Sequence, residues 1–142
     1  MIQGHGHGHR FQMKRIYVHF RRAGDNAQGN TVGFHGSLNP NSLYSVLRSL
    51  NVDGGDFVDF GAGDGKPLAA ALYLGASSVH GFELPQNSAN KLIFDASMRA
   101  MSNTVFLENP RRLLHAQYEM KDIEEVRKLQ LLHSSTETNF QA

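Results

Sequence analysis

The sequence contains no cysteine and no tryptophan, and only four of its 142 residues are proline. The absence of cysteine excludes disulfides, thiolate metal sites and cysteine nucleophiles. No apolar run approaches the roughly 18 residues of a membrane-spanning helix, and no segment resembles a secretory signal. These absences favour one soluble intracellular domain that makes no membrane contact.

Charge is distributed unevenly, although the formal net charge is only +1. Residues 1–50 hold six lysines and arginines against one acid, Asp25, so this part carries +5 and the remainder −4. A basic segment attracts phosphates because it releases their counterions. We therefore expect residues 1–30 to form a basic, low-complexity arm that either contacts nucleic acid or a nucleosomal surface, or serves only as a solvated leader.

Residues 1–10 consist largely of alternating glycine and histidine, a composition typical of an unordered tail. An extended chain would place His5, His7 and His9 on one side, but without a scaffold they would chelate only a stray ion, so no metal site is predicted. Residues 11–20 alternate loosely between apolar and basic residues, which suggests a short strand or a docking segment.

The regular part of the sequence begins at Asn39, where capping residues precede apolar residues at the spacing of a one-faced helix. Three short β-rich runs predict strands over 57–60, 78–82 and 104–107. One helix is expected after each strand: Pro67 to Leu74 after the first, a helix opened by Pro85 after the second, and Tyr118 to Leu132 after the third. The helix opened by Pro85 has Ala89, Leu92, Ile93 and Ala96 on one face. The alternation predicts an α/β, Rossmann-like fold, with a parallel sheet and flanking helices in a three-layer sandwich.

A glycine-rich turn stands between the first expected strand and the helix after it. Gly61, Gly63 and Gly65 alternate within it, and Ala62 lies between the first two. Glycine lets the backbone approach a ligand closely, and the start of the helix presents free N–H groups. This arrangement predicts a ligand-binding turn.

Two acidic residues flank the turn: Asp59 precedes its first glycine, and Glu83 ends the second expected strand. A carboxylate at the end of the second strand suits two ribose hydroxyls, while Asp59 would attract a cationic ligand and repel a pyrophosphate. S-adenosylmethionine has both a sulfonium and an ammonium, so the pair favours this cofactor. Taken singly, Asp59 could instead satisfy the turn amides, and Glu83 could cap the helix opened by Pro85.

Two competing glycine motifs differ from this one in their spacing. A Walker A loop needs a glycine where Phe60 stands and a serine or threonine where Pro67 stands, so that class is excluded. A dinucleotide fingerprint needs its third glycine at the position of Lys66. A nicotinamide-dependent oxidoreductase is therefore the weaker alternative.

Three segments share the pattern of a known family: a loop with Gly36, Pro40 and Ser42, the run from Phe57 to Lys66, and the run from Gly81 to Leu84. Over residues 31–101, about half of the chain, the sequence resembles the class I S-adenosylmethionine-dependent methyltransferases. Among these it is most similar to the histone-lysine methyltransferases of the disruptor-of-telomeric-silencing type. The implied activity is methyl transfer to a lysine of the histone core, with the nucleosome as partner and the nucleus as compartment.

The resemblance also implies which residues bind the cofactor. In the family, a Tyr-Gly-Glu segment closes over the cofactor, and here only Gly36 of that segment has a counterpart. Family members also place an acid and an aromatic residue after the third strand, where Glu108 is the candidate acid. The resemblance and the turn together give these cofactor-binding residues: Gly36, Asp59, Gly61, Ala62, Gly63, Gly65, Glu83 and Glu108.

Downstream of Leu107 the sequence offers no further strands, whereas the full family fold needs about four more. We therefore expect a partial domain over residues 31–133, truncated to its first three strands, and a polar tail over 134–142. The first strand would be an exposed edge, so the chain would be marginally stable, paired with another subunit, or a fragment. The missing part would position the acceptor, so no catalytic residue is assigned, and a non-catalytic cofactor- or partner-binding module is the alternative to an enzyme.

Overall fold

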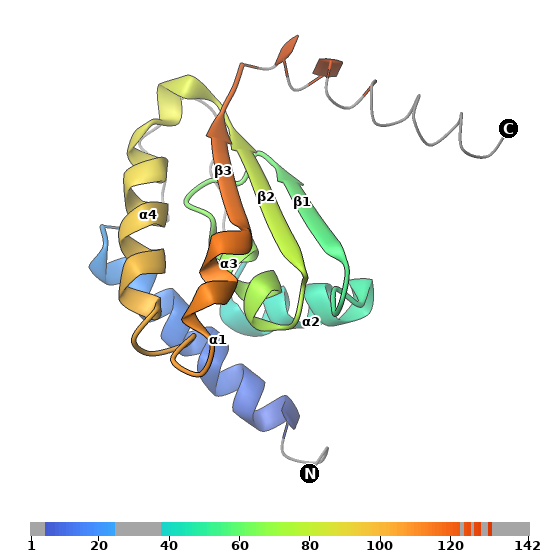
Figure 1. The fold of residues 1–142 in the computed structure, drawn as a ribbon, viewed down its shortest axis with the longest axis vertical. Coiled ribbons are helices and arrows are strands. Elements are labelled where there is room, and N and C mark those ends of the chain that lie inside the picture. The colour runs from blue at the N-terminus through green and yellow to red at the C-terminus, as the bar shows by residue number, and fades with distance from the viewer. Residues whose placement is uncertain (1–4, 25–37, 123, 126, 129–130, 132–142) are drawn as a thin grey trace, which may run out of the picture.

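The computed structural model describes residues 5–24, 38–122, 124–125, 127–128 and 131. Three parallel strands form one sheet in the order β1-β2-β3 (Figure 1), so the fold is α/β and Rossmann-like, with β1 at an edge as the sequence predicted. The elements in chain order are α1 (His5–Arg22), α2 (Pro40–Leu50), β1 (Asp56–Phe60), α3 (Lys66–Tyr73), β2 (Ser78–Glu83), the 3-10 helix η2 (Pro85–Asn87), α4 (Ala89–Met101), the 3-10 helix η3 (Pro110–His115) and β3 (Ala116–Met120).

The elements around the glycine turn form where local sequence signals predicted them. Asn39 caps α2 by accepting a hydrogen bond from the Ser42 amide at 2.8 Å, and Pro40 occupies the first helical turn. Gly75, whose φ is 112°, follows the end of α3 as expected for a residue past a helix C-terminus. The first predicted helix and the β1-α3-β2 unit are therefore confirmed.

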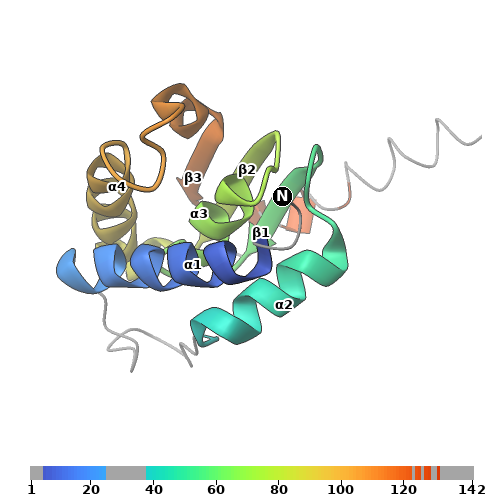
Figure 2. The ribbon, with the colours of Figure 1, turned by 90° about the horizontal axis from the view of Figure 1, so that it is seen from below.

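The described helices pack on one face of the sheet, so the expected three-layer sandwich is wrong for this part of the chain. The helix α3 lies against all three strands, and α1 crosses its outer side between α2 and α4 (Figures 1 and 2). On the opposite face of the sheet, Val58 and Phe60 are 48% and 44% exposed, and the Phe82 ring is covered by those of Phe60 and His80. The described residues thus form two layers.

The strand expected over residues 11–20 is wrong, because this segment belongs to α1, which also includes residues 5–10 of the expected tail. Met13, Ile16 and Phe20 have no exposed surface, and they lie on one side of the helix at i, i+3 and i+7. Burial of this apolar stripe on α3 stabilises a helix whose glycines and histidines have poor intrinsic helix propensity. The described part of the first thirty residues is therefore not simply a solvated arm, because one side of α1 belongs to the core.

The third strand is also displaced from its expected place. Residues 104–107 form turns that follow α4, in which the Phe106 amide donates to the Met101 carbonyl at 2.9 Å and the Phe106 side chain enters the core. Their aromatic and β-branched character reflects burial of a loop rather than a strand. The third strand is β3, and its last three residues, 118–120, were expected to begin a helix.

The helix after Pro85 is confirmed, but its predicted buried face is wrong. Its first turn is the separate 3-10 helix η2, and α4 then buries five residues along one side: Asn90, Phe94, Ser97, Met98 and Met101. Leu92, expected on the inner face, is 72% exposed. The prediction assumed that apolar residues mark the buried side of the helix, whereas the buried side includes the polar residues Asn90 and Ser97.

Replacement of Phe20 by alanine tests whether α1 belongs to the core. We expect Phe20→Ala to lower the free energy of unfolding by about 3–5 kcal/mol, because it removes a fully buried ring. The matched control is Phe11→Ala on the same helix, where the ring is 61% exposed and the expected change is within about 0.5 kcal/mol. Urea unfolding followed by circular dichroism measures both, and equal effects would contradict the packing of α1.

Candidate functional site

The candidate site is the glycine turn that joins β1 to α3 at the carboxyl end of the sheet. Its three glycines have positive φ values, 81° at Gly61, 59° at Gly63 and 94° at Gly65, which side-chain-bearing residues rarely adopt. The amides of Gly61 and Ala62 both donate to the Phe82 carbonyl, at 2.8 and 2.9 Å. These bonds fix the start of the turn to β2.

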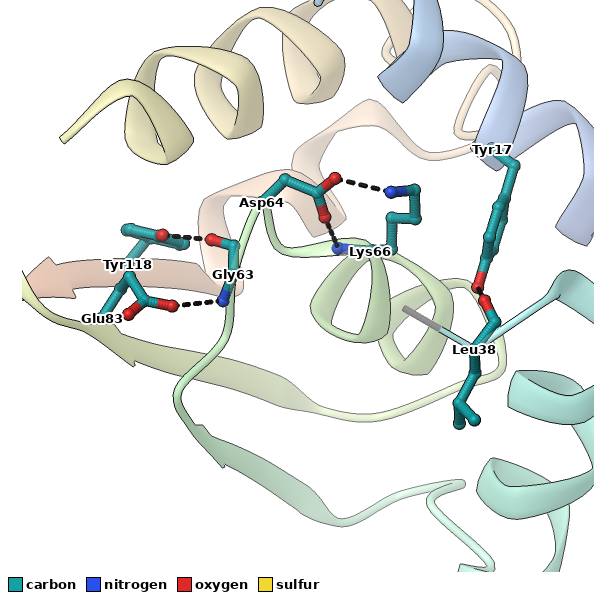
Figure 3. Close-up of polar contacts among 7 residues, drawn as sticks. All are labelled: Tyr17, Leu38, Gly63, Asp64, Lys66, Glu83 and Tyr118. Atoms are coloured by element: carbon teal, nitrogen blue, oxygen red, sulfur yellow. Dashed lines mark hydrogen bonds and ion pairs between the residues drawn. The ribbon is translucent and has the colours of Figure 1, made fainter. Parts of the chain in front are cut away.

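Glu83 at the end of β2 is the main polar support of the turn, and it is only 7% exposed. Its Oε2 accepts a hydrogen bond from the Gly63 amide at 2.6 Å (Figure 3). Its Oε1 accepts from the Leu84 amide at 2.8 Å and from Asn87 Nδ2 at 3.0 Å. The carboxylate therefore joins the turn to Leu84 and Asn87 at the two ends of η2.

Tyr118, which the sequence analysis did not single out, supports the same turn from β3. Its hydroxyl donates to the carbonyl of Gly63 (Figure 3). Its ring stacks on that of Phe94 with 5.0 Å between centroids. Burial and the negative charge of Glu83 raise the pKa of Tyr118, so the hydroxyl remains a donor throughout the physiological range. Gly63 is thus held through its N–H by β2 and through its C=O by β3.

Two glycines are required by close packing at this end of the sheet. A Cβ on Gly65 would lie 2.2 Å from Cδ1 of Phe94, and a Cβ on Gly81 would lie 2.5 Å from Leu68 and 2.8 Å from Ala62. Both distances are well inside van der Waals contact, so α4 and α3 approach the turn only because these side chains are absent. Gly65 therefore has a steric role in addition to its backbone conformation.

A buried ion pair joins the turn to the first residue of α3. Lys66 Nζ lies 2.6 Å from Asp64 Oδ2, and both side chains are less than a tenth exposed (Figure 3). The Lys66 ammonium also lies 5.3 Å from the centroid of the Tyr17 ring and 5.7 Å from that of Phe20. Because Tyr17 and Phe20 belong to α1, this cation joins α1 to the turn.

Asp59 is the electrostatically perturbed group of the site. It is partly buried on β1, facing the helical layer in register with Gly81, and its carboxylate makes no hydrogen bond to another described residue. Burial, and secondly the negative charge of Glu83, raise the pKa of Asp59 to about 6. The ionised form of Asp59 is therefore disfavoured relative to that of a solvent-exposed aspartate, and a cationic ligand would stabilise it.

The structure brings most of the predicted cofactor residues together at the turn. Ala62 is buried within it, in contact range of Gly81. Gly36 lies outside the described residues. Glu108 was chosen because the third strand was expected to end at Leu107. It instead precedes η3 and β3, and because the strands are parallel, the segment before β3 lies at the end of the sheet away from the turn. The first acid after the actual third strand is Asp122.

Tyr118 and Asn87 are the polar site residues that sequence reasoning missed. Tyr118 has a detectable signal, since residues 116–120 alternate between apolar and polar residues as a half-buried strand does. Asn87 has none, because its role depends on the path of η2. Two classes of site are absent from the described residues: no group of three His, Asp or Glu residues is placed to hold a metal ion, and no helix is long and apolar enough to span a bilayer.

Comparison with known proteins yields limited similarity. No protein-family model matches the sequence, and no curated protein matches it. Among solved structures, the chain is similar to a "putative RNA methyltransferase" from Pyrococcus horikoshii, with 21% identity and a TM-score of 0.40. The similarity covers 61% of this chain but only 36% of that protein. This likeness concerns the fold alone.

Alanine at Gly65 separates steric crowding from backbone strain. Gly54 is the matched control, because its φ is also positive, 76°, but a Cβ there would meet nothing within 4 Å. We expect Gly54→Ala to cost about 1–2 kcal/mol from strain, and Gly65→Ala to cost about 1–3 kcal/mol more from the collision with Phe94. Urea titration measures the difference. Combining Gly65→Ala with Phe94→Leu should cost less than the sum of the two single changes, and strict additivity would contradict the proposed collision.

The raised pKa of Asp59 predicts a pH-dependent stability. Because this pKa lies above the value of about 4 in an unfolded chain, the stability present below pH 4 is lost as the pH rises through about 6. Asp59→Asn should flatten this decline and stabilise the protein by about 1–3 kcal/mol at pH 7.5. The control, Asp56→Asn on the same strand, changes an exposed carboxylate and should retain the decline. Unfolding free energies between pH 4 and 8 measure both, and an unchanged slope in Asp59→Asn would refute the assignment.

Proposed function

We propose that the glycine turn binds S-adenosylmethionine and that the chain contains the cofactor-binding part of a methyltransferase domain. The observation that carries this proposal is the negative charge at the turn: Glu83 organises its backbone, and Asp59 lies beside it with no ion pair to another described residue. The cofactor carries an ammonium and a sulfonium, and either charge would stabilise the ionised Asp59. A pyrophosphate-containing cofactor would instead be repelled.

The polar atoms around the turn suit the rest of this cofactor. Asn87 Oδ1 is buried and makes no hydrogen bond to another described residue, although its Nδ2 donates to Glu83. A buried acceptor without a donor costs free energy, and a ribose hydroxyl would supply that donor beside the Glu83 carboxylate. Gly61 is exposed, so the backbone at the start of the turn is accessible to a ligand. The donors and acceptors present therefore fit the methionine and ribose parts of the cofactor.

The bound cofactor would supply an electrophilic methyl group on sulfur. The described residues would contribute orientation: the turn and Asp59 would hold the methionine part, while Glu83 and Asn87 would hold the ribose. Methyl transfer depends chiefly on holding the acceptor in line with the methyl group. We assign no catalytic acid or base among the described residues.

For the acceptor, we propose a lysine of the histone core, which rests on the sequence resemblance around the loop with Gly36 and around the turn. A radiolabelled cofactor incubated with nucleosomes tests this assignment. Label on histone H3 or H4 supports it. A chain that binds cofactor but labels neither would be a non-catalytic module or an enzyme with another acceptor, and in that case the cofactor site would stand while the histone assignment would fall.

Calorimetric titration with S-adenosylhomocysteine and S-adenosylmethionine tests the cofactor site. We expect both to bind the full chain at pH 7.5, and Asp59→Asn to weaken binding at least tenfold, because it removes the charge that would pair with the ligand cations. Affinity should also fall as the pH is lowered through about 6, where Asp59 takes up its proton. The Asp59→Asn variant should lose that pH dependence.

The control for this titration is Asp56→Asn, which changes an exposed carboxylate of the same strand and should bind as the unchanged chain does. NAD is the competing ligand. The absence of heat with either adenosyl ligand, in a sample shown folded by circular dichroism, would overturn the proposed cofactor. Tighter binding of NAD would favour the nicotinamide-dependent oxidoreductase.

A further inference from the structure

The outer face of α1 carries several cations that the proposed cofactor site does not use. The helix contains five lysines and arginines and no acid along its 18 residues. Arg10, Lys14, Arg21 and Arg22 are exposed, and none of them forms an ion pair with another described residue. Arg10, Lys14 and Arg21, separated by four and seven residues, lie along one side of the helix. We call this side, with Arg15, Arg22 and Phe11, the basic face of α1.

The basic face belongs to a wider segregation of charge. The helices α1, α2 and α4 carry eight lysines and arginines and a single acid, Asp95, which pairs with Lys91. Apart from Asp122, Glu124 and Glu125, which follow β3, the other acids of the described chain lie on strands and turns. Arg48 of α2 extends the basic region, because it donates to Tyr44, whose ring lies 6.0 Å from that of His9 in α1.

Folding alone does not explain the charges at the start of this helix. Arg21 and Arg22 stabilise the last turn of α1, where cations interact favourably with the helix dipole. Arg10 and Lys14 gain nothing of this kind, since like charges at i and i+4 repel and the amino-terminal half of a helix disfavours cations. The position of Arg10 and Lys14 on the exposed side of a helix that packs on the core therefore favours a role in binding an external anion.

We propose that the basic face of α1 binds single-stranded nucleic acid. From Arg10 to Arg22 the face is about 18 Å long, which is enough to contact several phosphates of one strand. Phe11 is 61% exposed among the cations, one turn from Lys14 and Arg15. Aromatic rings beside cations are what unpaired bases stack on, so Phe11 favours a single strand over a duplex and over an acidic protein.

A membrane surface fits the same charges less well. An interfacial helix inserts its apolar face into lipid, but the apolar face of α1, formed by Met13, Ile16 and Phe20, is completely buried against the rest of the protein. Only the charges and one ring remain outside. The proposal does not depend on cofactor binding, so it can be tested without cofactor.

The test is fluorescence anisotropy of labelled 20-nucleotide single-stranded RNA and DNA with the full chain between 50 and 200 mM KCl. With four or five phosphate contacts, the logarithm of the affinity should fall with log salt at a slope of about −3, roughly a 60-fold loss over this range. Arg10→Gln/Lys14→Gln should weaken binding at 50 mM KCl at least tenfold and reduce the slope by about 1.4. Phe11→Ala should weaken binding about fivefold while leaving the slope unchanged.

The matched control is Arg111→Gln/Lys128→Gln, which removes two exposed cations from outside α1 and lowers the net charge equally. It should change the affinity less than threefold, and circular dichroism establishes that each variant is folded. Three results would overturn the proposal: no binding at 50 mM KCl, equal weakening by the control, or tighter binding to phosphatidylserine vesicles than to the oligonucleotides.

Discussion

The hydrogen bond from the Gly63 amide to the Glu83 carboxylate is the constraint on which the carboxyl end of the sheet depends. Gly63 follows β1, Glu83 ends β2, and Tyr118 of β3 donates to the carbonyl of the same glycine. One peptide segment therefore joins all three strands. Because backbone groups buried away from water must find partners, loss of the carboxylate would leave the Gly63 amide unpaired and free the turn from β2. The conformation of the turn is thus a property of the whole sheet.

The same interaction generates the electrostatics of the site. Three donors hold the buried Glu83 carboxylate in place near Asp59. Burial first, and then the negative charge of Glu83, raise the pKa of Asp59. The cation of the neighbourhood, Lys66, is engaged with Asp64 on the helical side. Two carboxylates held close together repel each other and lower the stability of the folded protein. A cation bound between them would offset this repulsion, as is common at binding sites whose charges lower stability.

The sequence predicted the elements whose signals are local. Asn39, the glycines of the turn and Gly75 act through their own backbone conformation or their nearest neighbours, and the unit from β1 to Glu83 followed from them. The failures have tertiary causes. Met13, Ile16 and Phe20 had helical spacing, but glycines and histidines concealed it because packing, not propensity, makes that helix. Tyr118 reaches Gly63 only through the parallel register of β3 on β2, which no local pattern encodes.

The helix α1 connects the two surfaces for which we propose ligands. Its outer side carries the cations of the basic face, while Tyr17 and Phe20 on the same helix cover the ammonium of Lys66, which pairs with Asp64 in the glycine turn. Separating α1 from α3 would expose three fully buried apolar side chains and leave a buried ion pair without its aromatic cover, both of which are costly. The glycine turn and α1 therefore form one packing unit, although they are far apart in the sequence. Any account of the turn that omits the first 22 residues omits part of its support.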